Sequence, residues 1–123
     1  MDIIGSSHDP RGPEEKRLPF ADASPGMAGA ETLLSFGLGL VRDGVLSSGR
    51  LFETLSENPA RLLGLDCGVI NAGAPADLIL YEPDQPWQID GSKFVGMAGN
   101  TPLDRLPVQG RVKHTIKGGR LLR

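Results

Sequence analysis

The pattern of apolar and polar positions divides the chain into an extended start, a helical middle and a strand-rich end. Residues 2–7 read as one short apolar strand that runs into a polar loop beginning at His8. A strand whose carboxyl end delivers polar groups into a loop is typical of an α/β barrel. From residue 27 to 45, apolar residues recur at helical spacing, and Asp43-Gly44 is a plausible stop.

A second helix is predicted to follow this stop. Either Ser47 or Ser48 can cap it, because a serine side chain accepts a bond from the first free backbone N–H groups. Asn58-Pro59 predicts a new cap and a restart, since Asn caps helices and Pro is tolerated in a first turn. The short third helix is predicted to end at Gly64.

The rest of the chain alternates as strands do. A Gly118-Gly119 turn between the last two apolar runs predicts a β-hairpin. Asn100-Thr101-Pro102 is a candidate for an ordered loop. The strands are expected at residues 76–81, 87–90, 112–117 and 120–122.

Composition excludes several functional classes. The net charge of -2 offers no basic face for nucleic acid. No apolar run approaches the ~20 residues that span a bilayer, and the start lacks the pattern of a secretory signal. Cys67 is the single cysteine, so no internal disulfide can form. These features predict a cytoplasmic protein without a nucleic-acid or membrane partner.

The extended start has a further consequence. One barrel strand without partners cannot satisfy its own backbone hydrogen bonds. The chain is therefore expected to be the C-terminal piece of a larger enzyme-like protein, and its activity is expected to need residues that are not in it.

Particular residues along the whole chain resemble one known family. His8-Asp9-Pro10 is followed by Lys-Arg-Leu-Pro-Phe at residues 16–20, and Asn-Thr-Pro stands at 100–102. Together they resemble, in order and approximate spacing, the last barrel strand and later segments of the dihydroorotases, which are zinc-dependent cyclic amidohydrolases. Further matching residues lie at 26, 31–32, 56–60, 73–78 and 110–119.

This resemblance implies an α/β fold, namely the C-terminal portion of a metal-dependent (β/α)8 barrel followed by part of a small β-sandwich. Residues 1–65 would hold the last barrel strand, the active-site loop and the C-terminal barrel helices. Residues 66–123 would form the C-terminal half of the sandwich. The missing N-terminal barrel is then the first expected partner.

The resemblance also implies a reaction, the interconversion of N-carbamoyl-L-aspartate and L-dihydroorotate in pyrimidine biosynthesis. In the family, a metal-bound hydroxide attacks the ring amide and an Asp on strand eight shuttles the proton. Aligned on Pro10, that Asp position is Ser7, and the last His of the family motif is Arg11. A neutral hydroxyl cannot serve as a carboxylate base near neutral pH.

The candidate site residues follow from this alignment. Asp9 is the candidate catalytic residue, although in an extended strand its carboxylate lies about 6.6 Å beyond the family position. The guanidinium fork of Arg11 suits a substrate carboxylate. His8, Pro25 and Gly26 are the other candidate substrate-binding residues. The plainer alternatives are a polar loop pair at His8 and Asp9, a solvated charge at Arg11 and a helix-entry turn at Pro25-Gly26.

Four other residues are interpreted as structural. Asn58 is expected to be a helix cap and Asp77 to fix the turn into its strand. His114 is expected at a surface or interface, and Trp87 in the core or rim of the sandwich. Two histidines in the chain cannot complete a closed metal site, so no metal ligand is predicted in it. Zinc is implied only for the full-length family.

Three hypotheses remain open. The first is a dihydroorotase-type enzyme, homo-oligomeric when full length, of which this fragment alone is inactive. The second is a noncatalytic dihydroorotase-like subunit that scaffolds aspartate transcarbamoylase, which the serine at position 7 favours. The third is a small domain with no enzymatic role, which would leave apolar surface uncovered.

Overall fold

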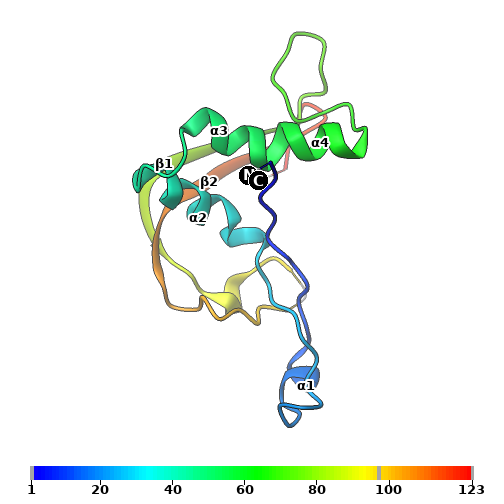
Figure 1. Cartoon of the computed structure of the whole chain (residues 1–123), viewed down its shortest axis with the longest axis vertical. Helices are drawn as coiled ribbons and strands as arrows, with labels where there is room; N and C mark the ends of the chain where they lie inside the picture. Colours follow the sequence, from blue (N-terminus) through cyan, green and yellow to red (C-terminus); the bar gives the residue numbers. More distant parts are fainter. Residues whose placement is uncertain (1, 97, 123) are drawn as a thin grey trace.

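The N-terminal segment is extended but forms no strand. The computed structural model describes residues 2–96 and 98–122 (Figure 1). Ile4 N donates to Thr54 O at 3.1 Å, and a parallel bridge joins His8 to Met27. No strand is therefore assigned over residues 2–7, and their place as the last strand of a barrel stays a prediction. In the described part of the chain no strand lies beside them, and without a neighbour the backbone has no ladder to join.

A projecting arm follows this segment (Figure 1). It carries the single turn α1, Pro13–Lys16, whose N-cap residue is Gly12. The chain then returns to the body and enters a 3-10 turn, Ala30–Thr32, and the helix α2, Leu33–Arg42. The helix predicted from residue 27 to 45 is confirmed in its centre, and Gly44, at φ 70°, follows its end.

The second helical segment is continuous. Ser47 caps α3, Ser48–Phe52, because its hydroxyl accepts the backbone N–H of Arg50 at 3.2 Å. The helix widens into a π-helical turn at Glu53–Glu57 and continues as α4, Asn58–Leu63.

The predicted cap at Asn58 is wrong, whereas the predicted restart is confirmed in that α4 begins at Asn58 after the π-helical turn. The backbone is already helical at Glu57, and Asn58 Nδ2 instead donates to the carbonyl of Asp2 at 2.8 Å. The wide turn ends two residues before Pro59, whose ring would clash with the carbonyl four residues earlier in a regular α-helix. Gly64, in the left-handed region at φ 65°, ends the helix as predicted.

The sheet has three antiparallel strands in the order β1-β2-β3. They are β1, Leu78–Gln88, β2, Pro107–Lys117, and β3, Arg120–Leu121, with a 3-10 turn at Gly91–Lys93 between the first two. The strands predicted at 76–81 and 87–90 are one strand, irregular between Glu82 and Pro86. The predicted hairpin is confirmed by the pairing of Lys117 with Arg120.

A small core forms where α2 packs on the sheet. Ser35 is buried, and its hydroxyl donates to the carbonyl of Gly110 at 2.7 Å. Half-buried Trp87 donates from Nε1 to the same carbonyl at 2.9 Å. This arrangement ties α2, β1 and β2 together through one acceptor. Leu51 and Ile89 are fully buried.

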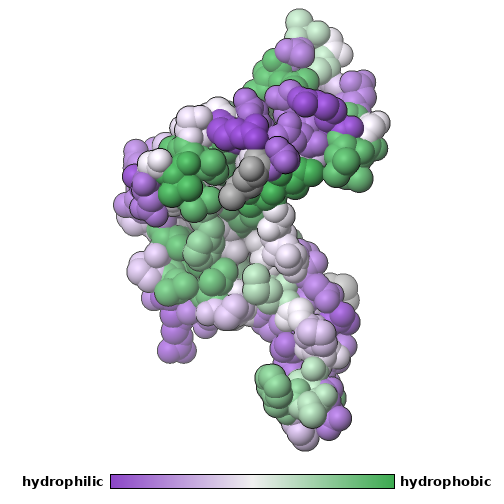
Figure 2. All heavy atoms as spheres, viewed as in Figure 1, coloured by the Kyte–Doolittle hydropathy of each residue, from purple (hydrophilic) through white to green (hydrophobic). Residues whose placement is uncertain are grey.

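Much apolar surface stays open outside this core. Phe20 on the arm is 100% exposed, and Leu62 and Leu63 at the end of α4 are 74% and 69% exposed. Figure 2 shows apolar surface at the tip of the arm and at the end of α4. Such surface on a chain this small is typical of a face that another part of a protein covers.

Candidate functional site

The loop from His8 to Met27 is closed at its base. Asp9 N donates to Met27 O at 2.9 Å, beside the bridge between His8 and Met27. His8 Nδ1 accepts the backbone N–H groups of Gly29 and Ala30, both at 3.2 Å. His8 therefore fixes the start of the following helical segment through one face of its ring, as the alternative interpretation of a polar loop residue expects.

Ser7 stands immediately before this base in the left-handed region, at φ 48°. Only Gly visits this region at no steric cost, while Asn and Asp are enriched there among other residues. The position that resembles a family Asp therefore has a backbone that suits Asp better than Ser.

Asp9, Arg11, Pro25 and Gly26 lie together in the structure, and their role as one site stays a prediction. Arg11 Nη2 forms an ion pair with Asp9 Oδ2 at 2.8 Å, and Arg11 Nε donates to Pro25 O at 3.1 Å. Glu15 Oε1 lies 3.7 Å from Arg11 Nη1. The guanidinium predicted to hold a ligand carboxylate is thus bonded within its own loop.

Gly26 is held tightly against Asp9. It has φ 116°, and a Cβ there would collide with the backbone oxygen of Asp9 and lie 2.8 Å from its Oδ2. Only glycine fits this position, because other residues rarely adopt such a backbone and their Cβ would meet a carbonyl. The Gly26 carbonyl accepts from Asn100 Nδ2 at 3.0 Å and from Lys16 Nζ at 3.4 Å.

Asn100 is the site residue that sequence reasoning missed. Its Oδ1 accepts the backbone N–H of Arg11 at 2.8 Å, and its backbone carbonyl accepts the N–H of Ala28 at 2.8 Å. The sequence offered one signal, the Asn-Thr-Pro motif predicted as an ordered loop. Nothing local tells that this loop contacts a segment 89 residues earlier.

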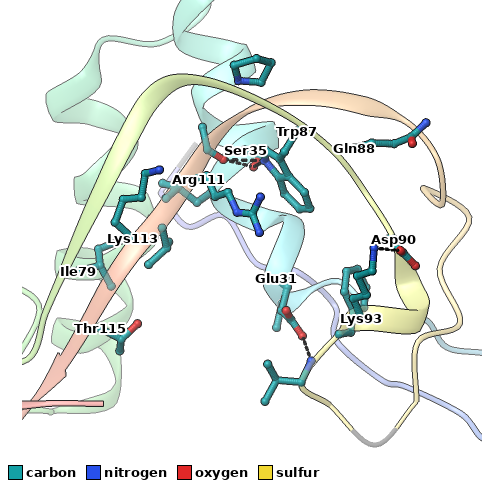
Figure 3. A pocket seen from close by; sticks show the side chains of 17 residues that line it. Glu31, Ser35, Ile79, Trp87, Gln88, Asp90, Lys93, Arg111, Lys113 and Thr115 are labelled. Atoms are coloured by element: carbon teal, nitrogen blue, oxygen red, sulfur yellow. Dashed lines mark hydrogen bonds and ion pairs between the residues drawn. The ribbon is translucent and has the colours of Figure 1, made fainter. Parts of the chain in front are cut away.

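Two hollows lie near these groups. A cavity of about 460 Å³ is bounded by Arg11, Lys16 and Arg17 on one side and by residues 98–100 on the other. A larger, open hollow of about 870 Å³ lies between the sheet and the start of α2 (Figure 3). Trp87, Arg111 and Glu31 line it, but none of the predicted site residues does.

Two carboxyl groups outside the loop have shifted pKa values, and both stabilise turns. Lys117 and the backbone N–H of Gly118 hold the pKa of Asp77 below its usual value. Asp77 therefore fixes the hairpin turn against the start of β1. Lys93 and Ser92 lower the pKa of Asp90 to about 2. His114 lies exposed on β2, as predicted for a surface residue.

The residues described here do not fit a resident metal by themselves. Within residues 2–96 and 98–122, no group of three or more His, Cys, Asp and Glu side chains could hold an ion. The lone pair of His8 Nδ1 is directed at two backbone N–H groups. No step of a reaction is therefore assigned to a metal on this chain.

Comparison with known proteins identifies the family. The model described as "Amidohydrolase family" matches residues 23–122. The chain belongs to the amidohydrolase family. This assignment agrees with the resemblance found in the sequence, that of a cyclic amidohydrolase.

Named relatives agree with that resemblance. The chain is 42% identical to a dihydroorotase of Desulforapulum autotrophicum and 38% identical to one of Anaeromyxobacter dehalogenans, each over 99% of the chain. It spans about 28% of the length of these curated relatives. The predicted resemblance to dihydroorotases is confirmed.

Solved structures give the fold. The L-hydantoinase (dihydropyrimidinase) from Arthrobacter aurescens superimposes with a TM-score of 0.89 at 32% identity, over 99% of this chain and 28% of that one. The dihydropyrimidinase from Brevibacillus agri superimposes with a TM-score of 0.92 at 23% identity. The helices and small antiparallel sheet are consistent with part of an amidohydrolase barrel enzyme. The boundary at 65/66 and the sandwich stay predictions.

One finding bears on membranes. Among the described helices, none is both long enough and apolar enough to cross a bilayer.

Proposed function

We propose that the protein carrying this chain is a dihydroorotase-type cyclic amide hydrolase that interconverts N-carbamoyl-L-aspartate and L-dihydroorotate. The observation that supports this most is the identity of 38–42% to proteins named dihydroorotase over nearly the whole chain. The chain contributes the loop of residues 8–27, and the cytoplasm stays the predicted compartment.

The guanidinium of Arg11 is the group proposed to bind the ligand. Both compounds carry a carboxylate, and a guanidinium binds such a group through two parallel hydrogen bonds. Arg11 is about one-third exposed and already paired with Asp9. A ligand carboxylate would take the place of Asp9 on the fork, while the bond from Nε to the Pro25 carbonyl keeps the guanidinium oriented.

Asp9 is a poor substitute for the base that the family has at position 7. Its Oδ2 accepts a hydrogen bond from Arg11 Nη2 at 2.8 Å, so this oxygen is already paired with the guanidinium and is not directed at a reacting group. We therefore propose that catalysis by the natural sequence is slow, because Ser7 supplies no carboxylate.

Other parts of the proposal lie outside this chain. Zinc, homo-oligomerisation and the rest of the barrel are implied by the family resemblance, and the chain alone is proposed to be inactive. The named relatives give no support to the scaffold of aspartate transcarbamoylase, so this alternative is not proposed.

The test is hydrolysis of L-dihydroorotate by the full-length metal-loaded protein and by its Ser7→Asp variant. The variant supplies a carboxylate at the family position, on a backbone that suits Asp. We expect kcat to rise by about 10²–10⁴-fold, the usual contribution of a positioned general base. Ser48→Asp, which adds the same charge at the exposed start of α3, is the matched control and should leave kcat unchanged.

Two results would contradict the proposal. No turnover of dihydroorotate by either the natural protein or Ser7→Asp would refute the function itself. Faster hydrolysis of hydantoin than of dihydroorotate would assign the protein to another cyclic amide.

A further inference from the structure

The segment between β1 and β2 forms a closed loop that contacts the loop of residues 8–27, which we call the ligand loop. It comprises residues 89–106, of which 97 is not described. Its neck is closed by two backbone bonds, from Ile89 N to Leu106 O at 3.0 Å and from Arg105 N to Ile89 O at 2.8 Å. Because Ile89 is fully buried, this neck is anchored in the core. We call this segment the 89–106 loop.

The described residues of the 89–106 loop form hydrogen bonds with the first part of the chain at two places. Glu31 Oε1 accepts the backbone N–H of Val95 at 2.7 Å (Figure 3). Asn100 makes the other contact, with three hydrogen bonds to Arg11, Gly26 and Ala28. The contact at Asn100 is therefore the denser of the two.

The side chain of Asn100 joins the two ends of the ligand loop. Its Oδ1 accepts from the N–H of Arg11 near the start of the ligand loop, and its Nδ2 donates to the carbonyl of Gly26 near the end. A side-chain amide offers both a donor and an acceptor, whereas a carboxylate offers only acceptors. An Asp of the same shape would therefore keep one bond and oppose the other.

In this geometry one residue is proposed to bind the ligand and another holds the loop in place. Arg11 is the group proposed to meet the ligand, and its backbone position depends on the bond from its N–H to Asn100. Gly26 sets where Asp9 and Pro25 lie around the guanidinium. A change at Asn100 would shift these partners without removing any of them.

We propose that Asn100 is a positioning residue that fixes the distance between the Arg11 and Gly26 ends of the ligand loop and so sets the affinity of the site for its ligand. This inference rests on the proposed function for the identity of the ligand. It acts through the loop, since Asn100 is assigned no contact with the reacting atoms.

The test compares Asn100→Asp with Asn58→Asp in the full-length protein. Asn58 is a matched control, because its Nδ2 also donates to a distant backbone carbonyl, that of Asp2 at 2.8 Å, but far from the loop. For Asn100→Asp we expect KM for dihydroorotate to rise about tenfold with kcat nearly unchanged, because ligand binding must then order the loop at a cost of about one hydrogen bond. Asn58→Asp should leave KM unchanged.

Amide hydrogen exchange gives a second readout that does not need turnover. Asn100→Ala removes the acceptor of the Arg11 N–H, so exchange at Arg11 should become faster, whereas Asn58→Asp should leave it unchanged. Equal KM values in the two Asp variants would overturn the proposal and leave the proposed function standing.

A full-length protein without activity on dihydroorotate would instead refute the proposed function. Exchange at Arg11 would then decide the role of Asn100. Faster exchange in Asn100→Ala supports the positioning of the loop, and unchanged exchange overturns it.

Discussion

Replacement of Gly37 by alanine tests how closely α2 and α3 pack. A Cβ at position 37 would lie 2.7 Å from Cδ1 of Leu51, which is fully buried and cannot move aside. In the same helix, a Cβ at Gly39 would meet only Arg42 Nη2, at 3.9 Å. The two glycines therefore share a helix but differ in the space around them.

The magnitudes decide the sign of each effect. Alanine gains about 1 kcal/mol over glycine inside a helix, and this gain applies at both positions. Overpacking a filled core costs about 1–3 kcal/mol, and this cost applies only at position 37. We expect Gly39→Ala to stabilise the protein by up to about 1 kcal/mol, and Gly37→Ala to be less stable than Gly39→Ala by about 1–3 kcal/mol.

Urea denaturation of both variants and the natural protein measures this difference in the free energy of unfolding. The combination of Gly37→Ala with Leu51→Ala provides the control. Leu51→Ala alone should cost about 2–5 kcal/mol, and the double variant less than the sum of the two, because the new methyl group occupies part of the cavity. Equal stabilisation by Gly37→Ala and Gly39→Ala would refute this account of the packing.

Two further predictions concern the sheet. Because the folded-state pKa of Asp77 is lowered by Lys117, its contribution to stability is present above the unfolded value near 3.8 and is lost as the pH falls through the folded value. Asp77→Asn should therefore flatten the loss of stability below about pH 4 in acid titrations followed by circular dichroism; an unchanged slope would contradict this. Trp87→Phe should cost about 1 kcal/mol in urea unfolding, since it removes the donor to the Gly110 carbonyl while the bond from Ser35 remains; no loss would show that this donor is dispensable.

Features with a local cause could be predicted from the sequence. The cap at Ser47, the end of the helix at Gly64 and the turn at Gly118-Gly119 each depend on residues within a few positions. The grouping of Arg11 with Pro25 and Gly26 followed from a family motif rather than from chain physics. The helix end and the turn are confirmed, the structure selects Ser47 from the two serines predicted as caps, and the role of the grouped residues as a site stays a prediction.

Features that depend on distant partners could not be predicted in this way. Residues 2–7 have the composition of a strand, but a strand needs a neighbour, and none lies beside them in the described part of the chain. Asn58 looks like a cap, but the helix continues through it and its amide bonds to Asp2. Asn100 has no local signal for its bond to Arg11, because the two meet only in the folded chain.

The close crossing of Gly91 and Gly99 within the 89–106 loop has a practical consequence for protein engineering. Gly91 and Gly99 cross so closely that a Cβ on either would collide with the other's backbone. The peptide between them is therefore bounded by two fixed points, and Asn100 lies just outside it. Exchanging or lengthening the sequence between these glycines would remove the bond from Val95 to Glu31. The hydrogen bonds of Asn100 to Arg11 and Gly26 lie outside the exchanged segment. Because Ala98 lines the cavity beside Arg11, an epitope or a reporter is best inserted at Val95-Gly96, which are exposed.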